Sequence, residues 1–206
     1  MKAIFIAAHP DDIEFGCAGT ISKLNKKNYE IIWILLTRGE NDIKHSGKKR
    51  IEEMYESARI LKVNEVYFLD LLDGEIKNDG VTINKISEII NKFNPDIVFT
   101  HYPDDRHQDH RNTSYSVRSA CWGNYNLLYF NSFSSIGFQP TLYVDTSNEI
   151  VAKTTVLNCY ISQVEKYLER NIDFVGTACA IDKKNGGDIH CISAEGFQMI
   201  NCVWNV

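Results

Sequence analysis

Two short runs of this sequence bring imidazoles and carboxylates together. The run HPDD at residues 9–12 ends an apolar stretch, and the run HQDH at residues 107–110 follows shortly after a second one. Two histidines and one carboxylate form a common ligand set for zinc in hydrolases, which leave a further coordination position open for water. We therefore predict that His9, Asp12 and His110 bind a metal ion.

The neighbouring polar residues could then hydrolyse an amide. A metal ion lowers the pKa of a bound water to about 7 and polarises a substrate carbonyl. Asp11 could accept the proton of that water as general base. His107 could stabilise the developing oxyanion or protonate the leaving amine, and Asp109 could fix the tautomer of an imidazole. Zinc is the expected metal, although the same ligand types accept Fe(II), Co(II) and Ni(II).

Each run by itself also fits a purely structural interpretation, because Asp is common in turns and at helix starts. The occurrence of both runs after apolar strands favours the metal site. Three more residues are candidates for substrate binding. Arg50 could anchor an anionic or hydroxyl-rich group, or pair with Glu53 on its own helix. Glu40 could lie at the rim of the site or cap the next segment, and His101 could line the pocket or be structural.

The elements that must position these residues alternate between strands and helices. Continuous apolar runs predict buried parallel strands, and apolar residues at helical spacing predict the helices between them. The expected strands are 2–8, 30–37, 65–69 and 95–100, and the expected helices are 17–27, 49–62 and 83–93. Parallel strands would bring residues 9–12, 37–40 and 101–110 to one edge of the sheet, where ligands bind in such folds.

The predicted fold is therefore α/β: one Rossmann-like, doubly wound, mostly parallel sheet flanked by helices, formed by a single domain over residues 1–206. The pattern loosens after Arg111, which predicts an irregular C-terminal third. The elements expected there are helices at 112–122 and 147–169 and strands at 127–132, 141–144 and 196–204.

Composition excludes several classes of protein. The net charge of −5 and the absence of a long Lys/Arg run argue against a nucleic-acid partner. The first apolar run is too short for a signal peptide or membrane span and is needed as a strand, so we expect a cytoplasmic protein with no membrane partner. Six cysteines without a CxxC pair predict neither a cysteine zinc site nor disulfides. The oligomeric state is not predicted, and a homo-oligomer stays an alternative.

These motifs, taken in order, resemble those of the LmbE-like (PIG-L-like) N-deacetylases, whose two signatures read approximately AHPDDE and DxHxDH. The chain has AAHPDDIE at 7–14 and DRHQDH at 105–110. Further similar segments are TRGE at 37–40, RIEEMYESARIL at 50–61, PDIVFTHYPDDRHQDHRNT at 95–113, KTTVLNCYISQ at 153–163 and AEGF at 194–197. The resemblance thus spans most of the chain. It departs at Glu14, which stands one position late, and across 123–145, where little matches.

The resemblance implies a zinc-dependent enzyme that removes acetyl from an N-acetylated amino sugar or sugar conjugate. By motif position it implies His9, Asp12 and His110 as zinc ligands and Asp11 as general base. Further roles follow by position: His107 stabilises the tetrahedral intermediate, Asp109 is its supporting carboxylate, and Arg50 holds the substrate.

Three alternatives stay open at this point. The substrate could be a free sugar, a sugar conjugate or a nucleotide sugar. The enzyme could hydrolyse another amide or an ester on the same scaffold. The chain could also be a non-catalytic sugar- or nucleotide-binding protein, although no GxGxxG motif follows its first strand.

Overall fold

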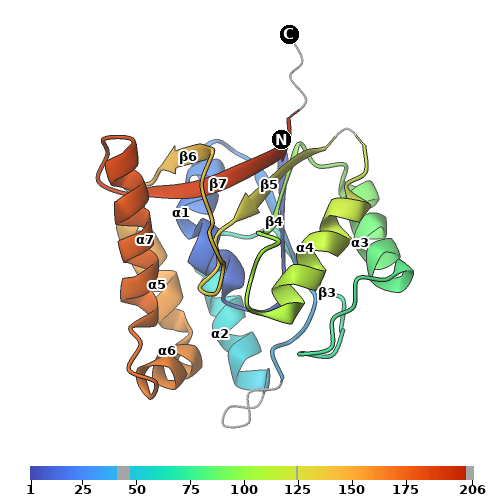
Figure 1. The fold of residues 1–206 in the computed structure, drawn as a ribbon, viewed down its shortest axis with the longest axis horizontal. Helices are drawn as coiled ribbons and strands as arrows, with labels where there is room; N and C mark the ends of the chain where they lie inside the picture. Colours follow the sequence, from blue (N-terminus) through green and yellow to red (C-terminus); the bar gives the residue numbers. More distant parts are fainter. Residues whose placement is uncertain (41–46, 124, 203–206) are drawn as a thin grey trace.

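The computed structural model describes residues 1–40, 47–123 and 125–202. Within these ranges the strands form one mixed sheet in the order β3-β2-β1-β4-β5-β7-β6 (Figure 1). Neighbouring strands are parallel from β3 to β5, whereas β7 runs antiparallel to both β5 and β6. The strands are β1 (Lys2–Ala7), β2 (Glu30–Leu35), β3 (Glu65–Phe68), β4 (Ile97–His101), β5 (Asn126–Phe130), β6 (Leu142–Asp145) and β7 (Ala194–Asn201).

Helices cover both faces of this sheet, as the doubly wound prediction requires. Helices α1, α2 and α5 contribute to the apolar core on one face, and α3 and α4 contribute to the core on the other. The helices are α1 (Asp12–Lys26), α2 (Gly47–Ile60), α3 (Gly80–Phe93), α4 (Gln108–Ala120), α5 (Ile150–Cys159), α6 (Ile161–Leu168) and α7 (Phe174–Asp188). None of the described helices combines the length and apolar character needed to cross a bilayer.

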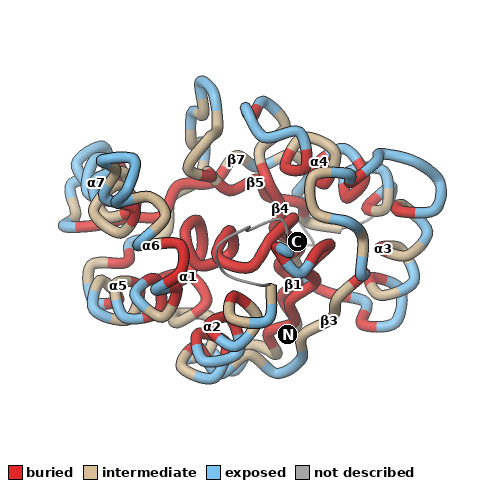
Figure 2. Tube along the Cα trace, turned by 90° about the horizontal axis from the view of Figure 1, so that it is seen from below, coloured by how far each residue is buried: buried red, intermediate tan, exposed pale blue. Residues whose placement is uncertain are grey.

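The central strand β1 shows why its apolar run is continuous. Ala3 and Phe5 belong to the core on one face, and Ile4 and Ile6 belong to the core on the other, because successive strand residues point to opposite faces. All four side chains are fully buried. Figure 2 shows the same arrangement, with buried strands and partly exposed outer helices.

The C-terminal third is more regular than the sequence pattern predicts. The helix expected at 147–169 is divided at Tyr160 into α5 and α6. Helix α7 has no counterpart among the predicted elements, since three glycines weaken its helical signal, yet the Asp173 carboxylate caps it by accepting from the N–H of Gly176 at 2.8 Å. The strand expected at 196–204 is β7, and residues 203–206 lie outside the described part of the chain. All six cysteines are free, as predicted.

Candidate metal centre

The two histidine-containing runs meet because β1 and β4 are neighbours in the sheet. The strand order changes direction in sequence between these two strands, and the carboxyl ends at such a switch point form the usual ligand crevice of doubly wound folds. Residues 9–12 follow β1 directly, and residues 107–110 open α4 just after β4. Helix α1 begins at Asp12, five residues before the predicted start, because the chain turns through a left-handed residue, Asp11, with φ of 96°.

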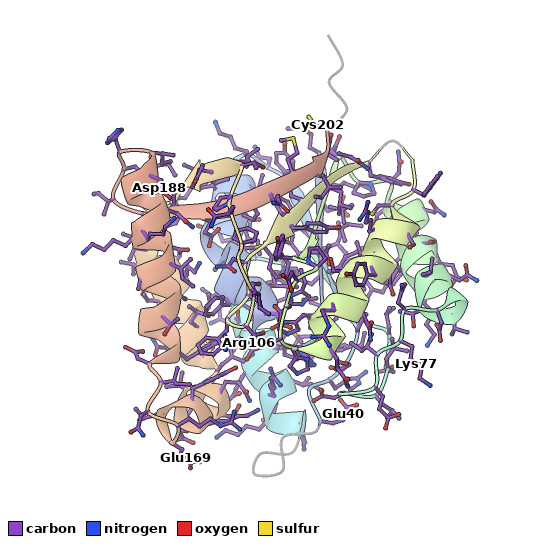
Figure 3. The ribbon with its side chains drawn as sticks, in the orientation of Figure 1. Glu40, Lys77, Arg106, Glu169, Asp188 and Cys202 are labelled. Atoms are coloured by element: carbon purple, nitrogen blue, oxygen red, sulfur yellow. The ribbon has the colours of Figure 1, made fainter. Side chains whose placement is uncertain are left out.

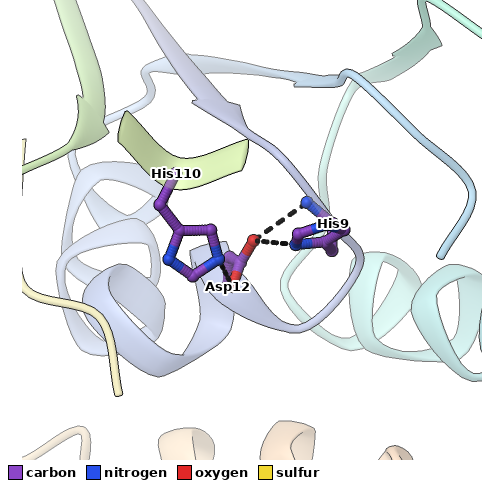
Figure 4. A group of neighbouring side chains, drawn as sticks. All are labelled: His9, Asp12 and His110. Carbon is purple, nitrogen blue, oxygen red and sulfur yellow. Dashed lines mark hydrogen bonds and ion pairs between the residues drawn. The ribbon is translucent and has the colours of Figure 1, made fainter. Parts of the chain in front are cut away.

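The carboxylate of Asp12 lies between the imidazoles of His9 and His110 (Figure 4) and close to a third imidazole, that of His101. Its Oδ2 is 3.3 Å from His9 Nδ1 and its Oδ1 is 3.3 Å from His110 Nε2. His101 Nε2 is also 3.3 Å from Oδ2. The backbone N–H of His9 donates to Oδ2 at 2.9 Å, which fixes the carboxylate on its own loop.

The donor set of His9, Asp12 and His110 fits a metal ion. One ligand atom from each residue can be chosen so that all lie within 4.8 Å of one another. Ligands held at about 2.1 Å around a tetrahedral zinc are about 3.4 Å apart, close to the 3.3 Å between Asp12 and each histidine. All three residues are buried, as a pre-formed site requires.

The electrostatics of this cluster favour a cation. Burial opposes a positive charge on His110, but the carboxylates of Asp12 and Asp105 outweigh it and raise the pKa of His110 to about 9. Burial likewise opposes the charge of His9, yet hydrogen bonds to Asp109, Asp12 and Asp73 raise its pKa well above the usual value. A bound metal ion would therefore take the place of protons on these imidazoles.

The other ring nitrogen of His9, Nε2, contacts two more carboxylates. His9 Nε2 is 3.2 Å from Asp109 Oδ2 and 3.0 Å from Asp73 Oδ1. Asp109 is itself fixed, because its carboxylate accepts from the backbone N–H groups of Gly74 at 2.7 Å and Ile76 at 3.3 Å. This support fixes the ring of His9 so that Nδ1 faces Asp12, the usual task of residues behind a metal ligand.

Asp105 supports His110 in the same way. Its Oδ2 is 3.2 Å from His110 Nδ1, so that Nε2 is the nitrogen directed toward Asp12. Asp105 accepts hydrogen bonds from the hydroxyls of Ser132, Ser134 and Ser135. Although burial opposes ionisation, these contacts keep the pKa of Asp105 below its usual value.

Asp11 does not contact the imidazoles but forms an ion pair with Arg50. The Nη2 of Arg50 donates to Asp11 Oδ1 at 2.8 Å, and its Nε donates to the carbonyl of Pro10 at 3.0 Å. Burial raises the pKa of Asp11, and the neighbouring guanidinium limits that rise. Gly39 leaves room for this guanidinium, because it has φ of 66° and a Cβ there would lie 2.7 Å from Arg50 Nη1.

These residues lie at one end of a cavity of about 460 Å³. His9, Asp11, Asp12, Arg50 and His110 contribute to its lining, together with His107 and Asp73. The rest of the wall is largely aromatic or basic, from Phe15, Phe133, Tyr167, Phe174, Lys166 and Arg170, and is completed by Gly74, Ser134, Gln163 and Ile172. The volume is in the range of small-molecule sites.

Comparison with known proteins places the chain in a family. Residues 4–121, more than half of the chain, match the model for PIG-L, described as GlcNAc-PI de-N-acetylase. The chain belongs to the PIG-L family. It is 31% identical over 186 residues to a diacetylchitobiose deacetylase of Thermococcus kodakarensis, covering 79% of this chain and 70% of the relative.

Two solved structures share the fold of this PIG-L family member. The conserved protein TT1542 of Thermus thermophilus superposes with a TM-score of 0.86 at 24% identity, covering 99% of this chain and 96% of that one. N,N'-diacetylchitobiose deacetylase from Pyrococcus horikoshii superposes with a TM-score of 0.83 at 24% identity, covering 97% and 83%. At these identities the likeness establishes the fold.

His107 lines the cavity and Asp109 lies beside His9, but their contacts differ from those expected. The resemblance implies that the carboxylate of Asp109 supports His107, whereas in the structure it contacts His9. The backbone N–H of Asp109 donates instead to His107 Nδ1 at 3.2 Å. Burial and the nearby His9 and His110 lower the pKa of His107, which favours its neutral form. Because Nδ1 accepts from the N–H of Asp109, the proton of neutral His107 belongs on Nε2.

Two residues expected to bind substrate lie away from the cavity lining. His101 is fully buried beneath Asp12 and stacks on His110 with ring centroids 4.1 Å apart, so it has no surface to offer a substrate. Its Nε2 accepts from the N–H of Ala8 at 3.1 Å, and burial lowers its pKa to about 4. Glu40 is exposed at the periphery (Figure 3), where its carboxylate accepts from the backbone N–H groups of Arg38 and Asp73.

Glu14, the acid that stands one position late in its motif, is buried between helices. Its Oε1 accepts from Ser57 Oγ at 2.7 Å and from Tyr160 Oη at 2.5 Å, which ties α1 to α2 and to the α5–α6 junction. Burial raises the pKa of Glu14 to about 7. Glu14 does not line the cavity, so its contacts are those of a residue that holds the helices behind the metal centre together.

The sequence interpretation did not single out Asp73, Asp105 or the wall formed by α6. Asp105 had a signal, because it is the first residue of the DxHxDH motif, and the serines at 132–135 were part of the region that matched little. Gln163 of α6 also had a signal, because it ends the family-like segment KTTVLNCYISQ. Asp73, Lys166 and Tyr167 had none that pointed to a site, since only the fold brings them to the cavity.

Proposed function

We propose that this protein removes the N-acetyl group from an amino sugar or a sugar conjugate in a metal-dependent hydrolysis. One observation carries the proposal: two imidazoles and a carboxylate with metal-ligand spacing share a cavity with a further buried carboxylate, Asp11. The PIG-L family and the similarity to a diacetylchitobiose deacetylase support an N-acetylated sugar as substrate. We also propose that residues 1–206 act as a single deacetylase domain.

The proposed metal ligands are His9, Asp12 and His110. When bound there, zinc or another divalent ion such as Fe(II), Co(II) or Ni(II) would polarise the amide carbonyl and lower the pKa of water. The carboxylates of Asp109 and Asp105 hold the two imidazoles in the tautomers and orientations that such binding needs.

Asp11 is the proposed general base. Its one described hydrogen bond to Arg50 uses Oδ1, which leaves Oδ2 to accept a proton. Burial raises the pKa of Asp11, while the charge and the hydrogen bond of Arg50 favour the ionised carboxylate that a general base needs. The same group can return the proton to the departing amine. A neutral His107 offers its Nε2–H to the developing oxyanion, in agreement with its place in the cavity lining.

The test is acetate release by metal-replete protein from N-acetylglucosamine, diacetylchitobiose and a nucleotide sugar, with O-acetyl esters for comparison. Asp11→Asn tolerates the left-handed backbone, so we expect it to retain bound metal while kcat falls by a factor of about 10² or more. Asp188→Asn serves as control, because Asp188 pairs with Lys184 on the exposed face of α7.

Each alternative gives its own result. Faster release from esters than from amides would identify a hydrolase of another class. Absence of bound metal, together with absence of metal-stimulated activity, would identify the non-catalytic binding protein. Full activity of metal-loaded Asp11→Asn would overturn the role of Asp11.

A further inference from the structure

A second cavity, of about 230 Å³, lies on the α5–α7 side of the fold (Figure 1). No residue that the structure describes lines both this cavity and the one at the metal centre. The second cavity is smaller than a typical site for a drug-sized ligand, so it is suited to a small one. Its lining includes Glu149, Ile150 and Lys153 from the start of α5, Asp182 and Lys183 from α7, and Ile192 just before β7.

Glu149 gives this lining a carboxylate that the fold does not fully use. The residue is 4% exposed, and its Oε1 accepts from the ammonium of Lys26 at 2.8 Å. Its Oε2 is also buried but accepts no hydrogen bond from any described residue. Glu149 stands directly before α5, yet its side chain does not cap that helix. A buried carboxylate oxygen without a donor is costly, so this oxygen is suited to a donor that a ligand brings.

Asp182 adds a second open carboxylate oxygen to the same cavity. Its Oδ2 contacts the ammonium of Lys153 at 2.6 Å, and its Oδ1 has no hydrogen bond within the described ranges. The same ammonium donates to Glu195 Oε1 at 2.9 Å, so one buried cation is shared between two acids. Burial raises the pKa of Asp182 to about 7. A cation bound nearby would therefore favour its ionised form.

The rest of the lining is suited to a short carbon skeleton. Ile150 and Ile192 contribute apolar side chains, and Ile192 is 71% exposed, which places it at the rim. Lys183 also lines the cavity, but it is exposed and its long side chain can keep the ammonium in water. The groups that are both buried and open to a ligand are thus the carboxylate oxygens of Glu149 and Asp182.

We propose that this second cavity binds a small organic cation, whose primary ammonium group donates to Glu149 Oε2 beside the negative charge of Asp182 while its carbon skeleton packs on Ile150 and Ile192. Two kinds of compound carry this chemistry: a simple alkylamine, and an amino sugar such as the one that the proposed deacetylation would release. The site itself does not depend on the proposed function, because its lining contains none of the proposed catalytic or metal-binding residues.

An NMR titration of isotope-labelled, zinc-supplemented protein tests the site. The probes are butylammonium and glucosamine, each with an uncharged analogue, butanol and glucose. Backbone amides of Ile150, Lys153 and Asp182 report the second cavity, and those of Arg50 and Tyr167 report the first. The positions of the shifted amides therefore locate each probe.

We expect at least one of the two cations to shift the amides of the second cavity in a saturable manner, with a Kd of about 1 mM or lower. Its uncharged analogue should bind there about 10-fold more weakly or less, because it lacks the charge-assisted hydrogen bond. The cation with the lower Kd identifies the ligand as an alkylamine or an amino sugar.

Substitutions test the proposed acceptor. Glu149→Gln keeps the size of the side chain and should weaken binding of the preferred cation about 10- to 100-fold. Asp182→Asn leaves Lys153 paired with Glu195 and should weaken binding by a smaller factor of about 3 to 10, which also keeps the test available if Glu149→Gln does not fold. Lys26→Gln is the matched control: it removes the exposed partner of Glu149 and should not weaken binding.

Three results would overturn the inference. Amide shifts confined to the first cavity would show that the second one is not a site. Equal affinity for a cation and its uncharged analogue would show that the charge is not recognised. Unchanged affinity in both Glu149→Gln and Asp182→Asn would show that these carboxylates do not bind the ammonium. Acetate release is measured separately and depends on the first cavity, so a failure of this site and a failure of the proposed function are distinguishable.

Discussion

Replacing Arg50 by Met removes both hydrogen bonds that hold the proposed general base. Arg50 and Asp11 are only 7% and 5% exposed. Water therefore cannot readily take the place of the lost guanidinium beside the Asp11 carboxylate. Breaking a buried ion pair by removing one member costs about 3–5 kcal/mol. The carbonyl of Pro10 also loses its donor at 3.0 Å. We therefore expect the free energy of unfolding to fall by about 4 kcal/mol.

Urea denaturation, followed by the fluorescence of buried Trp33, measures this loss. With an m-value of about 2.5 kcal/mol/M, the midpoint should fall by about 1.5 M. Arg50→Lys should lie between the wild type and Arg50→Met, because one ammonium can restore one of the two contacts. Arg59→Met on the same helix should leave the midpoint unchanged, since Arg59 and its partner Glu56 are exposed.

Activity provides a second readout for the same change. Without the guanidinium, burial raises the pKa of Asp11 further, and a base must lose its proton to act. The acid limb of the kcat/KM profile of Arg50→Met should therefore move to higher pH. An unchanged urea midpoint for Arg50→Met, or an acid limb that stays in place, would refute the argument that this pair holds the base.

Three other predictions follow from contacts near and away from the site. Gly39→Ala should reduce both stability and activity, because its Cβ would lie 2.7 Å from Arg50 Nη1 at a φ of 66°; wild-type values for both would contradict the geometry. Asp105→Asn should weaken metal binding about 10- to 100-fold in a chelator competition, since it removes the charged support of His110, and an unchanged affinity would show that the support is dispensable. Burial raises the pKa of Asp182 to about 7 despite its contact with Lys153, so the folded state holds a proton that the unfolded chain releases near pH 4. The stability that this proton contributes is present below pH 4 and is lost as the pH rises through 7, by at most about 1.4 kcal/mol per unit. Asp182→Asn should therefore flatten the fall in unfolding free energy between pH 5 and 8, and identical slopes for both proteins would exclude Asp182 as its origin.

The sheet and the meeting of the two histidine runs were predictable because they depend on local patterns. A continuous apolar run such as 2–8 marks a parallel strand covered on both faces, and such strands deliver their last residues to one edge. The ends of the helices were harder to predict from the sequence. The start of α1 depends on the left-handed turn at Asp11, which no periodicity in the apolar residues reveals.

The supporting residues could not be predicted, because their roles depend on distant contacts. Asp109 was expected beside His107, two positions away, but its carboxylate reaches His9, a residue 100 positions earlier. His101 has the same side chain as the proposed ligands, and it differs from them in the structure because its Nε2 accepts from the N–H of Ala8 and it does not line the cavity. The polar residues of α6 resemble an ordinary solvated surface in the sequence, and only the packing of the helix in the structure, which includes the contact between Glu53 and Ser162, makes them part of a cavity wall.

The left-handed backbone at Asp11 limits what evolution can place at this position. Gly and Asn, besides Asp itself, are the residues that enter this region at low cost. The replacements that preserve the turn are therefore two residues without a carboxylate. With Asp11 as the proposed general base, a lineage that changes position 11 would lose the proposed catalysis before it loses its shape, and it would keep the cavity and the proposed metal ligands. A single such substitution separates an enzyme of this architecture from a sensor that binds the same ligand and releases it unchanged.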